Sequence, residues 1–339
     1  MFKIKFTKSI CILSVLFLFS SCVSNNFAVT GKSPSWVTDT EHEYSKNNLC
    51  AVGIAKSLEE ANSIAISNIG KIIKQKIESE ITVVNSESMS SKGNSELTSS
   101  INQIVKTSAL IDSLVGVEIA ETWKDKDGNF YSLAILNKTK TYLYYSEKIS
   151  ENEKTIKENI NLISTDKDKF FIYGKLQNAI KLAQDNETYL DIIYAVNKAS
   201  YTVTAKTITK VNYIENLASD FARKIYITIS GLENKERIKN YFYKYFTDKG
   251  FSVNAPQTNY YFNIDLNIEN TTSGELFYAR YNFSANLKDA QNDTIIYSYS
   301  ASERVAHKSN ADANQQVIIR LEKKLDKEFN SDFIKSFNQ

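Results

Sequence analysis

The sequence is poor in proline, cysteine and histidine. Its 339 residues include 2 Pro, 3 Cys and 2 His. Pro34 and Pro256 lie far apart, which excludes an extended proline-rich linker. An excess of one charge is also lacking, because the formal net charge is +2 and falls to about −1 once Lys3, Lys5 and Lys8 are removed with an N-terminal signal. Nucleic-acid-binding proteins normally show a clear basic excess, so we expect no nucleic acid as a partner.

Residues 1–21 have the order of a bacterial lipoprotein signal peptide. Lysines are followed by the apolar run Ile10–Phe19, which falls short of the roughly 20 residues that span a bilayer. Ser20 and Ser21 then precede Cys22, and the four residues Phe19–Cys22 resemble a lipobox. This predicts a lipid on Cys22 and a membrane anchor. Leucine is usual where this chain has Phe19, so ordinary signal cleavage is the alternative.

The mature chain would begin with a lipidated tether at residues 22–34. Val23–Ser33 is polar and would reach about 20 Å as a flexible coil. Removal of Cys11 and lipidation of Cys22 would leave Cys50 alone, which excludes an internal disulfide in the mature monomer. We expect Cys50 to pack as a small apolar side chain at the start of a strand.

Residues 35–146 have the pattern of a small α+β domain. Leu58–Glu80 carries apolar residues at three- and four-residue spacing, which predicts an amphipathic helix. Ser57 and Glu60 suit a capping box at its start. Gly128 within Asp125–Asn129 favours a hairpin turn, because glycine readily adopts a positive φ. The expected strands are Leu49–Ala55, Ile81–Val84, Val115–Trp123 and Phe130–Leu136, and a second helix is expected at Ile101–Leu110.

Two further regions complete the predicted architecture. Residues 147–222 are charged and helical in pattern, and Asp185–Glu187 is expected to interrupt this connecting segment. Residues 223–339 have the pattern of a second domain, whose final helix is apolar at every fourth position. Its expected strands are Ile225–Ile229, Tyr260–Ile268, Leu276–Leu287 and Thr294–Ser302, with a helix at Lys235–Asp248. The predicted fold is α+β, with two small antiparallel-sheet-plus-helix domains joined by a helical segment.

A series of short motifs resembles a known family. The motifs are, in order, Pro34–Val37, Ala51–Ala55, Val115–Val117, Glu121–Trp123 and Asp127–Ala134. Their order after a lipobox-like cysteine resembles the LPP20 family of bacterial lipoproteins, whose domain is also similar to the N-terminal part of the flagellar protein FlgT. The resemblance covers about residues 35–145, and isoleucines replace some of the usual helix alanines. It implies an α+β envelope domain without established catalytic residues, so none is carried over.

The missing catalytic motifs favour a non-enzymatic structural or protein-interaction role. Trp36 and Trp123 are candidate interaction residues, because interfaces favour tryptophan, and packing inside the domain is their alternative role. An envelope hydrolase is a less favoured hypothesis, because neither His42 nor His307 has a nucleophile motif or metal-ligand spacing. A surface-exposed ligand-binding or host-binding lipoprotein is the other hypothesis. It would use a tyrosine face formed by Tyr260, Tyr261, Tyr278, Tyr281, Tyr297 and Tyr299, although such residues also pair within sheets.

No cofactor or metal is expected. Asp125, Asp127 and Asn129 resemble the start of an EF-type calcium loop, but Leu136 stands at the twelfth position, where a glutamate is needed. The expected partners are a membrane, through the lipid anchor, and an envelope protein. We expect the chain in the cell envelope at the outer membrane, on either its periplasmic face or the cell surface.

Overall fold

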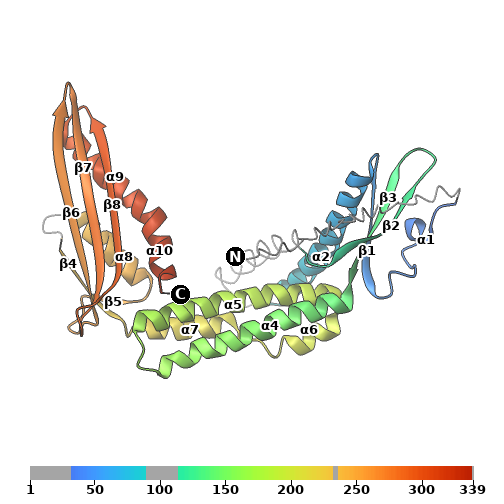
Figure 1. Cartoon of the computed structure of the whole chain (residues 1–339). Helices are drawn as coiled ribbons and strands as arrows, with labels where there is room; N and C mark the ends of the chain where they lie inside the picture. The colour runs from blue at the N-terminus through green and yellow to red at the C-terminus, as the bar shows by residue number, and fades with distance from the viewer. Residues whose placement is uncertain (1–31, 89–113, 232–235, 338–339) are drawn as a thin grey trace, which may run out of the picture.

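The computed structural model describes residues 32–88, 114–231 and 236–337. Two sheet domains rise from the two ends of a helical segment (Figure 1). The α+β fold predicted from the sequence is therefore confirmed. The predicted lipidation site, Cys22, and the helix expected at Ile101–Leu110 lie outside the described residues.

The N-terminal domain contains a three-stranded antiparallel sheet in the order β1-β3-β2. Gly128, with a φ of 80°, lies in the turn between β2 and β3, as the hairpin prediction requires. Ser57 accepts a hydrogen bond from the backbone N–H of Glu60 and thereby caps helix α2. The elements are α1 (Ser35–Thr38), β1 (Asn48–Ala55), α2 (Leu58–Ser88), β2 (Val117–Lys124) and β3 (Phe130–Asn137).

Helix α2 packs very closely against β1. Gly53 makes this possible, because a Cβ atom there would lie 2.1 Å from the carbonyl oxygen of Ala61 and 2.4 Å from the backbone nitrogen of Ala65. The strand expected at Ile81–Val84 is wrong, because these residues continue α2. Isoleucine, valine and threonine are only slightly poorer helix formers than other residues, whereas extending an existing helix is cooperative and adds one hydrogen bond per residue.

The helical segment connects the two domains. Its elements are α4 (Lys138–Asn161), a 3₁₀ turn (Leu162–Ser164), α5 (Lys169–Val196), α6 (Lys198–Thr204) and α7 (Val211–Ala222). The interruption expected at Asp185–Glu187 is wrong, because α5 is continuous. Asn186 is buried and hydrogen-bonds Asn152 and Glu153 of α4 at 2.8 and 2.9 Å. These bonds satisfy a side chain that would otherwise compete with the helix backbone.

The two ends of α5 belong to different hydrophobic cores. Phe170 and Tyr173 near its start pack in the core of the C-terminal domain. Ala195 and Val196 at its end pack in the core of the N-terminal domain, where Lys76 donates a hydrogen bond to the carbonyl of Ala195 at 2.9 Å. This single helix therefore fixes the spacing of the two domains seen in Figure 1.

The C-terminal domain has a five-stranded sheet in the order β5-β4-β6-β7-β8. It is mixed and not wholly antiparallel as expected, because β4 pairs in parallel with both β5 and β6. Helix α8 returns the chain to the starting end of β4, so the next strands run in the same direction. The elements are β4 (Tyr226–Gly231), α8 (Glu236–Asp248), β5 (Ser252–Val253), β6 (Tyr260–Ser273), β7 (Leu276–Asp289), β8 (Ile295–His307), α9 (Asn310–Lys324) and α10 (Asn330–Lys335).

A π-helical segment, Leu325–Phe329, joins α9 to α10. The buried stripe of this helix repeats at every fourth residue, at Ala313, Val317, Leu321, Leu325, Phe329, Phe333 and Phe337. In a regular α-helix each such step would rotate the stripe by about 40°. The wider π turn offsets part of this rotation. The stripe consequently faces the sheet along its whole length.

Candidate functional site

The face of the N-terminal sheet that points away from α2 combines apolar side chains with carboxylates of β2, among them that of Glu121. Residues of β1 alternate between the two faces, and those on the face away from α2 are Cys50, Val52 and Ile54. Leu133 of β3 pairs with Val52, and Glu121 of β2 pairs with Leu133. Residues paired across a sheet share a face. The carboxylate of Glu121 therefore lies beside apolar neighbours.

Two aromatic side chains from the segment before β1 close over this face. The Trp36 indole Nε1 donates a hydrogen bond of 2.6 Å to Oε2 of Glu121. The Tyr44 hydroxyl donates one of 2.6 Å to Oε1 of the same carboxylate. Trp36 is 4% exposed, and Leu133 is fully buried. We call Trp36, Tyr44 and Glu121 the aromatic clamp, because together they hold the start of the domain against its sheet.

The electrostatics of the aromatic clamp keep the Tyr44 phenol neutral. The hydrogen bond to Glu121, together with burial and the nearby negative charge, raises the pKa of Tyr44 to about 12. A carboxylate that accepts two short hydrogen bonds has both oxygens engaged. The clamp therefore performs an architectural role.

Next to the aromatic clamp the same sheet face remains partly open. Ile54, Tyr131 and Trp123 pair in register across β1, β3 and β2, and we call them the apolar row. Ile54 is 51% exposed, and the rings of Trp123 and Tyr131 are 5.0 Å apart. The Trp123 indole Nε1 is buried and lacks a hydrogen-bond partner among the described residues. The row offers one exposed aliphatic side chain beside two half-buried rings.

The structure separates the two tryptophans proposed as interaction residues. Trp36 is buried and belongs to the aromatic clamp, so its ring is not an exposed anchor. Trp123 is half-buried and belongs to the apolar row. An interaction role for Trp123 stays a prediction. Sequence reasoning missed Glu121 and Tyr44 as partners of Trp36, although Glu121 lies in the motif that carries the family resemblance.

Comparison with known families identifies this part of the chain. Residues 34–137 match the model of the LPP20 lipoprotein family. This domain belongs to the LPP20 family. The matched region begins just before Trp36 and ends with β3, so it contains both the aromatic clamp and the apolar row. Comparison with curated proteins finds no match.

Three solved structures resemble parts of the chain. The secreted protein HP1454 from Helicobacter pylori has 14% identity and a TM-score of 0.41, over 81% of this chain and 96% of that one. A minor lipoprotein from Acinetobacter baumannii has 13% identity and a TM-score of 0.26, over 31% and 92%. Lipoprotein GNA1162 from Neisseria meningitidis has 10% identity and a TM-score of 0.22, over 30% and 99%.

Two other residues considered in the sequence analysis, Cys50 and Asp125, are engaged in packing and hydrogen bonding within the LPP20 domain. Cys50 is half-buried in β1, where burial raises the pKa of its thiol and the charge of Lys138 opposes that shift. Asp125 accepts hydrogen bonds of 2.7 Å from the backbone and from the side-chain amide of Asn129. These bonds lower the pKa of Asp125. Its oxygens thus close the hairpin turn.

The two histidines lie in different domains. His42 lies in the loop before β1, and its ring centroid is 6.0 Å from that of Tyr44. His307 ends β8, with its Nδ1 3.2 Å from a carboxylate oxygen of Asp312. The described residues hold no group of three or more His, Cys, Asp or Glu side chains placed to bind a metal. None of the described helices is long and apolar enough to cross a membrane.

The tyrosines of the C-terminal sheet do not form one exposed face. Tyr260, Tyr281 and Tyr297 are buried against the helices. Tyr299 packs against Phe329, with their ring centroids 5.6 Å apart. On the other face of the sheet, Tyr278 is covered by the guanidinium of Arg304, 4.0 Å from its ring centroid. The alternation along each strand therefore divides the tyrosines between the two faces.

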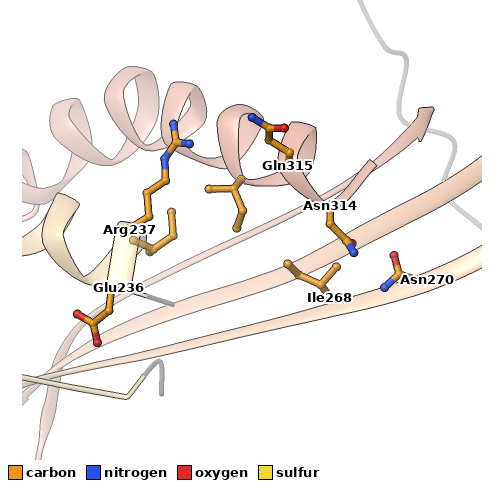
Figure 2. A pocket seen from close by; sticks show the side chains of 8 residues that line it. Glu236, Arg237, Ile268, Asn270, Asn314 and Gln315 are labelled. Atoms are coloured by element: carbon orange, nitrogen blue, oxygen red, sulfur yellow. The ribbon is translucent and has the colours of Figure 1, made fainter. Parts of the chain in front are cut away.

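A hollow of about 450 Å³ lies between α8, α9 and β6 of the C-terminal domain (Figure 2). Its apolar lining comes from Ile238, Ile268 and Ile318. The guanidinium of Arg237 at its rim forms a two-point ion pair with Glu322, at 2.5 and 2.6 Å. This pairing ties α8 to α9. The hollow therefore lies at the joint between these helices.

Proposed function

We propose that this chain is a lipid-anchored protein of the bacterial envelope that acts as a non-enzymatic structural or protein-interaction module. The family match supports the lipoprotein part of this proposal. The aromatic clamp carries the rest, because it holds the chain to the sheet only 14 residues after the predicted lipidation site at Cys22. A short tether followed by a fixed attachment would keep the LPP20 domain close to the membrane surface.

The apolar row supplies the interaction surface of this proposal. Ile54 is exposed on the same sheet face that the aromatic clamp covers elsewhere. Fully burying an exposed side chain of this size gains about 1.5–3 kcal/mol, and Ile54, which is 51% exposed, would gain about half of that. An envelope protein that packs on Ile54 and Trp123 would bind next to the tether. The expected location is the outer membrane, with the domains on its periplasmic face or on the cell surface.

Replacement of Cys22 by serine tests the anchor. In the wild-type chain, mass spectrometry should find a diacylated N-terminal cysteine at position 22, and the protein should stay with membranes in high salt. The Cys22→Ser variant should be released into the soluble fraction, because each buried CH₂ of the lost lipid contributes about 0.8 kcal/mol. Cys50→Ser is the control and should remain at the membrane. An unmodified Cys22 in the wild-type chain would contradict the anchor.

A pair of exposed isoleucines tests the interaction surface. Ile54 of the apolar row and Ile66 of α2 are 51% and 45% exposed and lie on opposite sides of the LPP20 domain. Ile54→Asp should abolish the complexes that crosslinking detects in native membranes, and Ile66→Asp should leave them unchanged. Equal yields of crosslinked complexes from both variants would count against the apolar row.

A further inference from the structure

One edge of the C-terminal sheet is long and open. β8 is the last strand in the sheet order and pairs with β7 alone among the described strands. Its 13 residues contrast with the opposite edge, where β5 has 2 residues. Natural sheets usually protect an edge by shortening it or by placing proline or charge on it. The β5 edge is protected by its shortness, whereas the β8 edge is long and has its charged side chains, Glu303 and Arg304, only in its C-terminal half.

The central part of β8 is suited to pairing with another strand. Residues Tyr297–Ser302 carry no charge and no proline, and they alternate tyrosine or alanine with serine. The Tyr297 hydroxyl donates a hydrogen bond to Asp332 at 3.0 Å, and the Tyr299 hydroxyl donates one to Glu328 at 3.2 Å. These bonds fix the strand to the helix beneath it. The backbone edge is therefore held rigid before any partner arrives, which lowers the entropic cost of binding.

A row of basic side chains flanks this edge. We call Arg320, Lys323, Lys324 and Lys327 the basic row. Together with Glu303 of β8 they line a hollow of about 540 Å³. Arg320 pairs with Glu303 at 2.6 Å, and Lys324 approaches Glu328 at 4.0 Å. Lys323 and Lys327 are exposed and form no ion pair within the described part of the chain. Two positive charges beside the edge are thus left for a partner.

We propose that the β8 edge and the basic row form a docking groove for an extended acidic segment of a partner protein. The segment would add a strand to the sheet through main-chain hydrogen bonds, as in other cases of strand addition. Acidic side chains on the helix-facing side of the added strand would meet Lys323 and Lys327. This surface is in a different domain from the apolar row, so it goes beyond the proposed function.

Charge disfavours a second copy of this chain as the occupant. Two β8 strands paired antiparallel would be related by a two-fold axis perpendicular to the sheet. Both α9 helices would then lie on the same face, and their basic rows would meet each other across the axis. Like charges placed together weaken such an interface. An acidic strand from another protein has no such penalty.

Peptide binding to the full-length mature protein tests this proposal. The probe is a fluorescent peptide of alternating valine and glutamate, about eight residues long, and fluorescence anisotropy measures its binding. We expect a matched valine–lysine peptide to bind about tenfold more weakly, because two exposed ion pairs are lost. The double variant Lys323→Glu, Lys327→Glu should reverse this preference. The control variant Lys154→Glu, Lys157→Glu makes the same charge change on α4 and should leave it unchanged.

A second probe separates strand addition from simple charge attraction. N-methylation of alternate residues of the acidic peptide removes the main-chain donors along one edge and leaves its charge intact. The methylated peptide should lose binding. Equal binding of the two acidic peptides, or no binding of either, would overturn the proposal. So would a dimer in sedimentation equilibrium that the Lys323→Glu, Lys327→Glu variant alters, because the edge would then be occupied by a second copy.

Discussion

The N-terminal and C-terminal domains both pack helices on one face of a sheet, but their cores are made of different side chains. In the N-terminal core, alanine and isoleucine such as Ala65, Ile69 and Ala134 allow α2 to lie almost in backbone contact with β1. In the C-terminal core, aromatic rings fill a wider space. The ring centroid of Phe242 lies 4.9 Å from that of Phe262 and 5.2 Å from that of Phe329. The first core depends on close approach and the second on ring packing.

The sheet faces that point away from the helices also differ between the two domains. In the N-terminal domain that face is mainly apolar and is partly covered by the aromatic clamp. In the C-terminal domain it is polar and exposed, with cross-strand hydrogen bonds such as Ser298 to Asn286 at 2.7 Å and Ser302 to Asn282 at 3.0 Å. The N-terminal domain therefore offers a partner an apolar face, whereas the C-terminal domain offers a backbone edge.

Substitution of Gly53 by alanine should destabilise one domain relative to the other more than any other change considered below. The new Cβ atom would overlap the backbone of Ala61 and Ala65, which cannot rotate away as a side chain can. We expect a loss of about 3 kcal/mol in the free energy of unfolding of the N-terminal domain. Hydrogen exchange measured across a urea series should show lower protection of the backbone amides of β1 and α2. The amides of the C-terminal domain should be unaffected.

Gly128→Ala is the matched control for this substitution. A Cβ atom there meets nothing within 4 Å, although its φ of +80° is unfavourable for alanine. The backbone strain alone should cost about 1 kcal/mol. Similar losses for the two variants would show that the close approach of α2 to β1 contributes nothing beyond ordinary glycine conformation.

Local features of these domains could be predicted from the sequence because each rests on a few neighbouring residues. Gly128 marks the hairpin turn, and Ser57 caps α2. The helix predicted at Lys235–Asp248 ends where α8 ends, and Gly250, with a φ of 84°, follows it as is usual after a helix. The strands at β1 and β3 start and end within one residue of their predicted bounds. In each case the signal lies inside a window of a few residues.

Features that depend on distant residues could not be predicted in this way. Asn186 continues α5 because Asn152 and Glu153 satisfy its amide, and these partners are more than 30 residues away. Glu121 and Trp36 are 85 residues apart, so the aromatic clamp has no local signal. The four-residue spacing of the final helix did hold information that was missed. A stripe with a period longer than 3.6 residues requires a wider turn somewhere along it.

Alkaline pH should weaken the C-terminal side more than the N-terminal side, because more of its tyrosines have a raised pKa. In the N-terminal domain these are Tyr44 and Tyr131, and in the C-terminal core they are Tyr173, Tyr245, Tyr260, Tyr281 and Tyr297. Burial raises the pKa of Tyr173, in the C-terminal core, to about 12, whereas an unfolded tyrosine ionises near pH 10. The folded state favours the neutral phenol, so this contribution is complete below pH 10 and is lost as the pH rises towards 12. At pH 11 the loss should be about 1.4 kcal/mol for this residue, measured by urea unfolding across the pH series.

Tyr173→Phe should remove this part of the pH dependence, and Tyr243→Phe should not. Tyr243 is 46% exposed on α8 and lies outside the C-terminal core, so this variant controls for the loss of a tyrosine hydroxyl elsewhere. Burial also raises the pKa of Tyr260 and Tyr297 in the same core. The free energy of unfolding of the wild-type chain should therefore fall at alkaline pH by more than Tyr173 alone contributes. An unchanged slope in Tyr173→Phe would contradict this account.

The smallest effect should come from Glu121→Gln in the aromatic clamp. Glutamine keeps one acceptor oxygen for the Trp36 indole, and its NH₂ group can donate to the Tyr44 hydroxyl, so the geometry survives while the charge is lost. We expect a loss of about 1 kcal/mol in the free energy of unfolding. The pKa of Tyr44, raised to about 12 mainly by its bond to Glu121, should fall towards its ordinary value in an ultraviolet titration.

Glu118→Gln, an exposed position on the same strand, should change neither the free energy of unfolding nor the pKa of Tyr44. A Tyr44 titration that Glu121→Gln leaves unmoved would show that the clamp is open in solution and that the start of the LPP20 domain is free of its sheet.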